Sequence, residues 1–432
     1  MTVIFSKSGP LAALSPADRL ALCDRRTSTD SVVRSTTAAI LERVSRDGDR
    51  ALCELARELD GVDLASLEVP DSFWNECLAG IAPDLRAAME RTFRNLASVS
   101  RAFAPRAEET EVEPGVIVGR RPDPLARVGV YAPGGRAAYP SSVLMCAVPA
   151  RVAGVGEVIV CSPPAADGRP SPAVLAAAAL AGVDRVFAIG GAGAIAAMAF
   201  GTASVPRVDR IVGPGNAWVA EAKLQISGTV SIDCPAGPSE LLVIADDSVD
   251  PRRVAQELIA QAEHDPLASA VVVALDADTK RRIAVALVRE RISEPRLRTV
   301  IEALAARGAL LLAETLDEAL AFAAEFAPEH LLLAVRDADA ALARVRNAGA
   351  VFVGASSSVA FGDYMTGANH VLPTGGLARS YSGLSPLDFV RWTSWQRVTP
   401  RAAASLAPAV ATFAEAEGLS AHAVAARSWE EQ

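Results

Sequence analysis

Four histidines are the residues of this 432-residue chain whose side chains could most readily bind a metal or move a proton. His264 lies in QAEHDP, His330 in APEH, His370 in GANHVLP and His422 in EGLSAH, and each has a carboxylate or amide side chain within five residues. Such neighbours suit both metal binding and acid–base catalysis. A single histidine beside a polar residue is also common on surfaces and in hydrogen-bonded cores. Four such motifs in a histidine-poor chain favour a shared metal or proton-transfer site.

Two pairs of residues stand out. Gln261 and His264 are three residues apart on a predicted helix, so their side chains share a face and can present neutral donors to a metal. Glu329 and His330 follow Pro328 in a predicted turn before a strand. From a turn, both side chains can reach one substrate, with one acting on water and the other on a hydroxyl. A plain hydrogen-bonded contact is the alternative for each pair.

The cysteines limit what the metal site can be. No two of them form a C-x-x-C pair, which favours reduced core residues over a disulfide framework or a zinc–thiolate site. Any zinc would therefore be held by nitrogen and oxygen donors. The six residues are Cys23, Cys53, Cys77, Cys146, Cys161 and Cys234.

Composition excludes several classes of partner. A net charge of −9 leaves no basic stripe for nucleic acid or an acidic membrane surface. The hydrophobic fraction of 51% fits a globular protein with a large core. The longest apolar run, around Ala173 to Ala181, is too short to span a bilayer, and residues 1–20 contain no apolar core of signal-peptide length. We therefore expect a cytoplasmic protein.

Strand–helix alternation predicts the fold class. After an arm over residues 1–25 and a helical region from Ser31 to about Arg101, residues 119–126 read as an exposed connection. Short Val- and Ile-rich runs then alternate with helical patterns, which predicts two tandem Rossmann-like, incompletely doubly wound parallel-sheet units. A helical tail is expected from about Ser385. The runs begin at Val128, Glu157, Arg185 and Arg210 in the first unit, and at Leu241, Ala270, Ala309, Leu331 and Ala350 in the second.

Loops rich in Gly and Pro follow the strands of the first unit. They include YAPGGR from Tyr131, GGAG from Gly190 and VGPGN from Val212. Such loops at the carboxyl ends of parallel strands bring backbone N–H groups to an anion, so we expect a nucleotide there. Residues 191–196 also match the relaxed G-x-G-x-x-G/A pattern, but this match arises easily by chance in an Ala- and Gly-rich chain.

The longer motifs closely resemble the histidinol dehydrogenase family. They are VYAPGGR with PSSVLM, VGPGNAWVAEAK, DCPAGPSE, QAEHD, APEH, GDYMTGANHVLPT and EGLSAH, and the resemblance extends from the arm to about Ala425. The family oxidises L-histidinol to L-histidine through histidinal in two NAD-dependent steps. The resemblance implies a zinc/catalytic domain over residues 26–127 and 240–384, an NAD-binding domain over 128–239, and a tail over 385–432.

The resemblance also implies roles for individual residues. His330 is the expected base for the hydroxyl proton in the first oxidation, and Glu329 the expected base that activates water in the second. Zinc, one per subunit, anchors the substrate's imidazole and amine. Its implied ligands are Gln261, His264, Asp363 and His422, and the implied substrate-contacting residues are these four with Ser239, His330, His370 and Glu417.

Three positions match NAD contacts of the family, namely Tyr131, Gly193 and Asn216. The family usually has Gln where this chain has Gly193, and a lost amide contact weakens binding by roughly 1 kcal/mol. The implied assembly is a homodimer with intertwined chains, in which the tail with Glu417 and His422 completes the partner's site. An isolated monomer would then lack one zinc ligand.

Three other functions remain to be compared with histidinol oxidation. A paralogue that oxidises another small polar alcohol, such as a sulfonated propanediol, would share the zinc and the Glu–His pair. A zinc hydrolase would use zinc with Glu and His to activate water, but the nucleotide-type unit argues against it. A non-catalytic binding protein would have no need of the acid–base pair.

Overall fold

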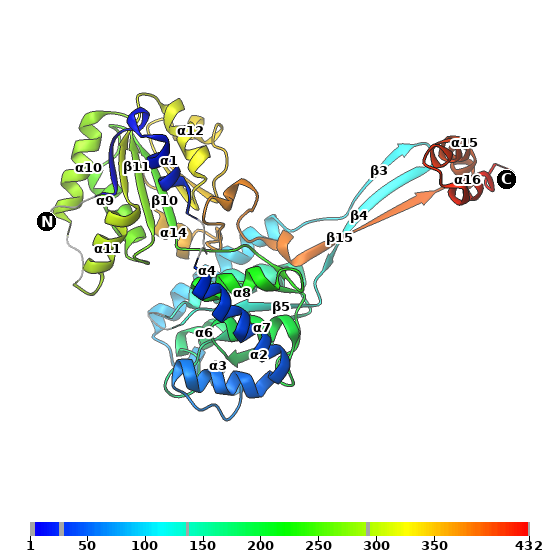
Figure 1. Ribbon diagram of the computed structural model, residues 1–432, viewed down its shortest axis with the longest axis horizontal. Helices are drawn as coiled ribbons and strands as arrows, with labels where there is room; N and C mark the ends of the chain where they lie inside the picture. Colours follow the sequence, from blue (N-terminus) through cyan, green and yellow to red (C-terminus); the bar gives the residue numbers. More distant parts are fainter. Residues whose placement is uncertain (1–4, 26–29, 135–137, 291–293, 431–432) are drawn as a thin grey trace.

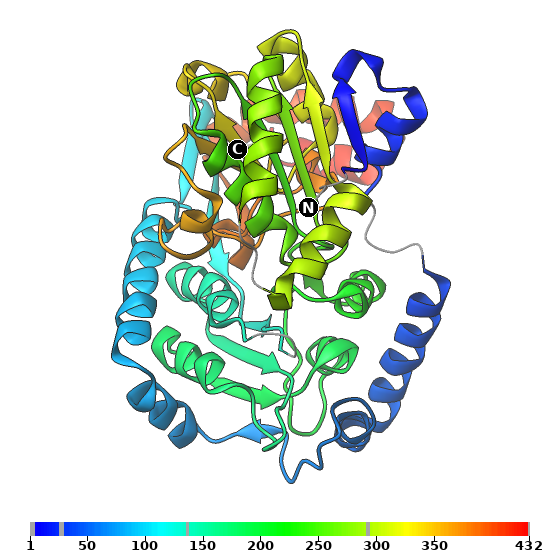
Figure 2. The ribbon, with the colours of Figure 1, turned by 90° about the vertical axis from the view of Figure 1, so that its left-hand side faces the viewer.

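The computed structural model describes residues 5–25, 30–134, 138–290 and 294–430, so part of the YAPGGR loop, Gly135 and Arg136, lies outside the described residues. Two six-stranded sheets covered by helices form the body, and a three-stranded sheet leaves it as a long ribbon ending in two helices (Figure 1). Figure 2 shows the two large sheets one above the other. The predicted fold class, α/β with two Rossmann-like sheets, is confirmed.

The first sheet has the order β1-β12-β11-β10-β13-β14, and every neighbouring pair is parallel. Apart from β1, the strands follow the Rossmann order 3-2-1-4-5 and lack only the sixth strand. In β10, Leu241 and Val243 enter one core and Leu242 and Ile244 the other, which explains its unbroken apolar run. The strands are β1 (Lys7–Pro10), β10 (Glu240–Ala245), β11 (Ser269–Ala274), β12 (Ala309–Leu312), β13 (His330–Ala334) and β14 (Ala350–Val353).

The second sheet has the order β2-β7-β6-β5-β8-β9, and β2 is its antiparallel strand. In β6, Val158 and Val160 enter one core, and Ile159 and Cys161 the other. The strands are β2 (Glu68–Val69), β5 (Arg127–Tyr131), β6 (Glu157–Ser162), β7 (Arg185–Ala188), β8 (Arg210–Val212) and β9 (Ser231–Ile232). All nine predicted strands of the two units are present; β1, β2 and β9 were missed.

Helices supply a separate core on each face of each sheet. The first sheet carries α9 (Pro251–Ala262), α10 (Ala277–Arg289) and α11 (Glu294–Arg307) on one face, with α1 (Pro16–Cys23), α12 (Leu316–Phe326) and α13 (Ala338–Leu342) on the other. The second carries α3 (Asp71–Gly80), α4 (Pro83–Ala102), α5 (Pro140–Ala153) and α6 (Pro172–Ala181) opposite α2 (Ser31–Leu55), α7 (Gly191–Phe200) and α8 (Ala217–Ile226). No helix among the described residues is long and apolar enough to cross a membrane.

Two expectations about the N-terminal region are wrong. The described part of the arm predicted over residues 1–25 is not separate, because β1 pairs in parallel with β12 at the edge of the first sheet. Residues 26–127 were grouped with that sheet, but α2 packs on α7 and α8, α3 on α6, and β2 pairs with β7 of the second sheet. Helical periodicity reveals an apolar face but does not say which sheet the face covers.

The ribbon corrects two further expectations. Residues 119–126, expected as an exposed connection, mostly belong to β4 (Val116–Pro124), which pairs with β3 (Glu108–Glu113) and β15 (Val390–Val398). The tail from Ser385 therefore begins with a short 3₁₀ turn and a strand, and only then forms α15 (Pro400–Ala416) and α16 (Ser420–Arg427). Charged residues on both faces of solvent-exposed strands hide the alternation by which sequence reveals a strand.

Candidate active site

Glu329 and His330 lie at the amino edge of the first sheet, where β13 begins. The connection from α12 turns through Ala327, whose φ of 50° is left-handed, and Pro328 then leads directly into the strand. A Cβ at Gly349 would lie 2.6 Å from the carbonyl oxygen of Glu329. The segment that leads into β14 can therefore pass this close to Glu329 only because residue 349 is a glycine. In the register of the sheet, His330 lies beside Leu241, the second residue of β10.

The Glu329 carboxylate is buried and held on one oxygen. Its Oε2 accepts hydrogen bonds from the Ser239 hydroxyl at 2.5 Å and from the Glu240 backbone N–H at 2.7 Å. Burial raises the pKa of Glu329 to about 8, against the opposing effect of these two hydrogen bonds. The group can therefore accept a proton and release it again near neutral pH.

The ring of His330 has one tautomer that fits its surroundings. Nδ1 lies 3.0 Å from the carbonyl oxygen of Glu240, and because that oxygen can only accept, Nδ1 must donate. Nε2 is then the nitrogen with a free lone pair, and it is buried without a hydrogen-bond partner among the described residues. Burial lowers the pKa of His330, so the ring is neutral at physiological pH and Nε2 can serve as a base.

Three of the four predicted zinc ligands come from the body of the protein. Gln261 is buried in the last turn of α9, whereas His264 lies two residues beyond the helix, so the expectation that both are on one helix face is wrong. Asp363 is on α14 (Val359–Tyr364), with Oδ1 3.8 Å from His330 Nε2. Burial raises the pKa of Asp363 to about 6, while His330 opposes that rise. His370 Nδ1 lies 3.0 Å from the Asp363 carbonyl oxygen.

A pocket of about 830 Å³ opens beside these residues, between the two sheets. His264 lines it together with Tyr139 at the start of α5 and with Phe361 and Tyr364 of α14. Glu329 and His330 are only 6% and 4% exposed and lie outside the pocket lining. The pocket is large enough for a small polar substrate.

The donor set suits zinc only in part within one chain. The described residues contain no group of three or more His, Cys, Asp or Glu side chains placed to hold a metal ion. The buried amide of Gln261 leaves its nitrogen without a hydrogen-bond partner among those residues, and rotation of the amide would point its oxygen there instead. Gln261, His264 and Asp363 are nitrogen and oxygen donors acceptable to zinc, so one further donor is needed for a tetrahedral site.

Glu417 and His422 lie far from the other predicted residues. Both are exposed, Glu417 at the end of α15 and His422 on α16, at the tip of the ribbon (Figure 1). The chain's own ribbon therefore keeps these two side chains away from the first sheet.

The three predicted cofactor residues share a second pocket. Tyr131, Gly193 and Asn216 all line a pocket of about 420 Å³ at the carboxyl ends of β5, β7 and β8. The Tyr131 hydroxyl accepts a hydrogen bond from the Gly191 N–H at 3.1 Å, and Asn216 caps α8 by accepting from the N–H groups of Trp218 and Val219. With its oxygen used in the cap, the Asn216 amide nitrogen remains to donate to a ligand.

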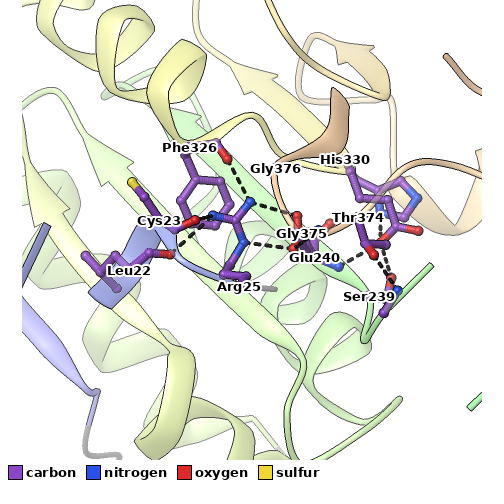
Figure 3. A network of polar contacts seen from close by, with 12 residues as sticks. Leu22, Cys23, Arg25, Ser239, Glu240, Phe326, His330, Thr374, Gly375 and Gly376 are labelled. Atoms are coloured by element: carbon purple, nitrogen blue, oxygen red, sulfur yellow. Dashed lines mark hydrogen bonds and ion pairs between the residues drawn. The ribbon is translucent and has the colours of Figure 1, made fainter. Parts of the chain in front are cut away.

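Two residues close to the candidate bases, Arg25 and Glu240, were not predicted from the sequence. Figure 3 shows Arg25 against Glu240, and Glu240 beside Ser239, His330 and Gly375. Glu240 ends the DCPAGPSE motif, so its neighbour Ser239 was a signal for it. Nothing around Arg25 in the sequence indicates a role at this site.

Comparison with known proteins identifies the family of the chain. The model of the histidinol dehydrogenase family matches residues 23–428. The histidinol dehydrogenase of Methanosarcina barkeri is 43% identical over 419 residues, covering 97% of this chain and 96% of its own. That of Natronomonas pharaonis is 47% identical over 414 residues, with 96% and 97% covered. The crystal structure of histidinol dehydrogenase from Elizabethkingia anophelis superimposes with a TM-score of 0.94 at 31% identity, covering 99% and 98% of the two chains.

Proposed function

Because the chain belongs to the histidinol dehydrogenase family, a family of oxidoreductases, we propose that it oxidises L-histidinol through L-histidinal to L-histidine. The reaction is the end of histidine biosynthesis and removes four electrons at one site. The observation that carries the proposal is the pairing of two buried bases: neutral His330 with a free Nε2, and Glu329, whose pKa lies near 8.

The first oxidation needs a base for the hydroxyl proton. His330 Nε2 accepts that proton, while Nδ1 keeps its hydrogen bond to the Glu240 carbonyl oxygen. The imidazolium formed has the Asp363 carboxylate close by, with Oδ1 3.8 Å from Nε2. This charge stabilises the protonated ring during the step.

The second oxidation needs a base for water. Ionised Glu329 takes a proton from the water that adds to the aldehyde carbon, and the hydrate formed is then oxidised to the carboxylate. The Ser239 hydroxyl and the Glu240 N–H hold Glu329 Oε2 in place, which leaves the other oxygen to face the water. Ser239, expected to contact substrate, thus also orients the base.

We assign the zinc to Gln261, His264 and Asp363 of one chain and His422 of a second copy, one ion per subunit. We assign NAD to the pocket of Tyr131, Gly193 and Asn216. When bound, zinc supplies an electrophilic anchor for the substrate's imidazole and amine, and NAD supplies the hydride acceptor for both oxidations. The buried Gln261 amide and the nitrogen–oxygen donor set support the metal assignment.

His370 and Glu417 complete the proposed substrate contacts, with Glu417 reaching the site from the second copy together with His422. Glu417 and His422 can therefore act at this site only in a homodimer, which we propose as the active form in the cytoplasm. The distance of the ribbon tip from the chain's own first sheet supports this arrangement (Figure 1).

The test is NADH production by zinc-loaded protein with limiting L-histidinol. The expected yield is about two NADH per histidinol, with histidine as product and loss of turnover on chelation. Turnover with a sulfonated propanediol and none with histidinol would instead assign the chain to a paralogue with another substrate. No NADH from any alcohol would contradict a dehydrogenase.

A further inference from the structure

Glu240 connects both candidate bases to a buried ion pair. Its backbone N–H donates to Glu329 Oε2 at 2.7 Å, and its carbonyl oxygen accepts from His330 Nδ1 at 3.0 Å. Its side chain accepts from Arg25 and, at 2.7 Å, from the backbone N–H of Gly375 (Figure 3). One residue thus contacts both bases through its main chain and is itself fixed through its carboxylate.

The guanidinium of Arg25 is fixed by hydrogen bonds from all three of its nitrogens and by an aromatic ring. Its Nε and Nη2 lie 2.8 and 2.9 Å from the two carboxylate oxygens of Glu240, and Nη2 also donates to the Phe326 carbonyl oxygen at 2.7 Å. Nη1 donates to the carbonyl oxygens of Leu22 and Cys23 at 3.2 Å each. The guanidinium stacks 3.5 Å from the centre of the Phe326 ring. The Arg25 and Glu240 side chains are only 2% and 3% exposed.

These contacts place Arg25 at the approach to both bases. Phe326 ends α12 three residues before Glu329, and Glu240 begins β10. Arg25 therefore fastens the start of β10 to the end of α12 and to the end of α1. A fork of fixed donors sets distance and angle together, which a flexible lysine does not.

Stability alone is a poor reason for such a pair. Desolvation of two buried charges offsets most of their attraction, and apolar residues of similar size often fill such a place as well. We propose that Arg25 and Glu240 are a positioning pair, which touches no substrate but sets the placement of Glu329 and His330. This inference rests on the proposed function for its kinetic consequence.

The decisive variant removes both charges together, Arg25→Met with Glu240→Gln. It leaves no unpaired buried charge, and the glutamine oxygen can still accept from the Gly375 N–H. In zinc-loaded full-length protein we expect kcat to fall about 100-fold with histidinol and with histidinal, the loss typical of small misplacements of catalytic groups. KM for NAD should stay unchanged, since the cofactor pocket is formed by other residues.

A partly exposed pair with the same two-nitrogen contact supplies the control, Arg185→Met with Glu68→Gln. Arg185 also donates through two nitrogens to Glu68, at 2.8 and 2.6 Å, binds the Ser204 carbonyl oxygen and stacks on Phe187. Arg185 lies at the amino end of β7, whereas the cofactor pocket lies at the carboxyl ends of the strands of the same sheet. We expect kcat to remain within about twofold of wild type, because exposed ion pairs contribute little.

A second readout does not depend on turnover. With only four histidines, ¹⁵N-imidazole labelling gives few signals, and His330→Asn identifies those of His330. The Arg25→Met/Glu240→Gln variant should shift the His330 ring signals, whereas the Arg185→Met/Glu68→Gln variant should not. Arg25→Lys retains the positive charge but not the forked guanidinium donors, so its kcat should lie below that of the wild type.

The outcomes separate the two proposals. If wild type oxidises histidinol and the folded Arg25/Glu240 double variant keeps both its kcat and its His330 signals, the positioning pair is overturned. If wild type fails to oxidise histidinol, the proposed function is lost, and the His330 signals alone decide: a shift supports the pair, and unchanged signals reject it.

Discussion

His330 directs Nδ1 at the carbonyl oxygen of Glu240, 3.0 Å away, and this contact fixes Nε2 as the unprotonated nitrogen of the ring. An imidazole free to adopt either tautomer would present a lone pair from Nε2 only part of the time. Anchoring by a main-chain carbonyl also leaves Nε2 facing Asp363 rather than solvent.

His330→Asn should impair the first oxidation far more than the second. Asparagine keeps a polar side chain but has no basic lone pair, so kcat with histidinol should fall about 10²- to 10⁴-fold. Stopped-flow formation of NADH from histidinol and from histidinal measures the two steps separately. Equal losses in the two steps would contradict the division of roles between His330 and Glu329.

Glu329→Gln should abolish aldehyde oxidation and its pH dependence. Only the ionised carboxylate accepts a proton from water, so the wild-type rate with histidinal should rise with pH through about 8 and level off above it. The rate of the first step should be flat above neutral pH, because the pKa of His330 is lowered. A wild-type histidinal profile already level at pH 6 would show that Glu329 is not the limiting base.

Glu329→Gln should also stabilise the zinc-free protein at alkaline pH. The carboxyl titrates near 4.5 when unfolded and about 8 when folded, so the folded state binds more protons between these values. Stability of the wild type therefore falls as pH rises through this window, whereas the glutamine does not titrate. At pH 9 the variant should be more stable by on the order of 1 kcal/mol or more, measured by urea unfolding. Glu302→Gln, at a side chain of α11 that is 43% exposed, should show no such gain.

Gly193→Gln should lower KM for NAD. A Cβ at position 193 would lie 3.4 and 3.5 Å from the side chains of Leu55 and Leu52, which is ordinary van der Waals contact, so a Cβ is accommodated. One added hydrogen bond of about 1 kcal/mol corresponds to roughly a fivefold lower KM. Gly193→Ala adds the same Cβ without the amide and should leave KM unchanged. Equal effects of the two variants would rule out the amide contact.

Mixing two inactive variants should restore activity if the tip of the ribbon serves a second copy. His422→Asn should remove a zinc ligand, and His330→Asn a base. A hybrid dimer would carry both lesions in one site and neither in the other. Coexpression should therefore recover about a quarter of wild-type activity, whereas each variant alone stays inactive. No recovery, together with full zinc in His422→Asn alone, would place both residues outside a shared site.

The proximity of the two proposed bases, Glu329 and His330, was predictable because the residues are adjacent and their motif is distinctive. The strands of both large sheets were predictable from apolar runs that are buried on both faces. The ribbon was not, since strands such as β3, EETEVE, expose every residue and carry no apolar alternation. Arg25 was not either, because it meets Glu240 across 215 residues of sequence, and no local pattern records a contact that the tertiary fold creates.

The ribbon has a thermodynamic consequence for the proposed zinc site. A lone chain offers the metal Gln261, His264 and Asp363, and its own His422 is carried away on α16. If the fourth donor arrives only on pairing, metal affinity and subunit affinity become linked quantities, and each must strengthen the other by the same factor. Dilution would then release zinc, and chelation would loosen the dimer. Zinc supply would in this way set how much of the protein is assembled.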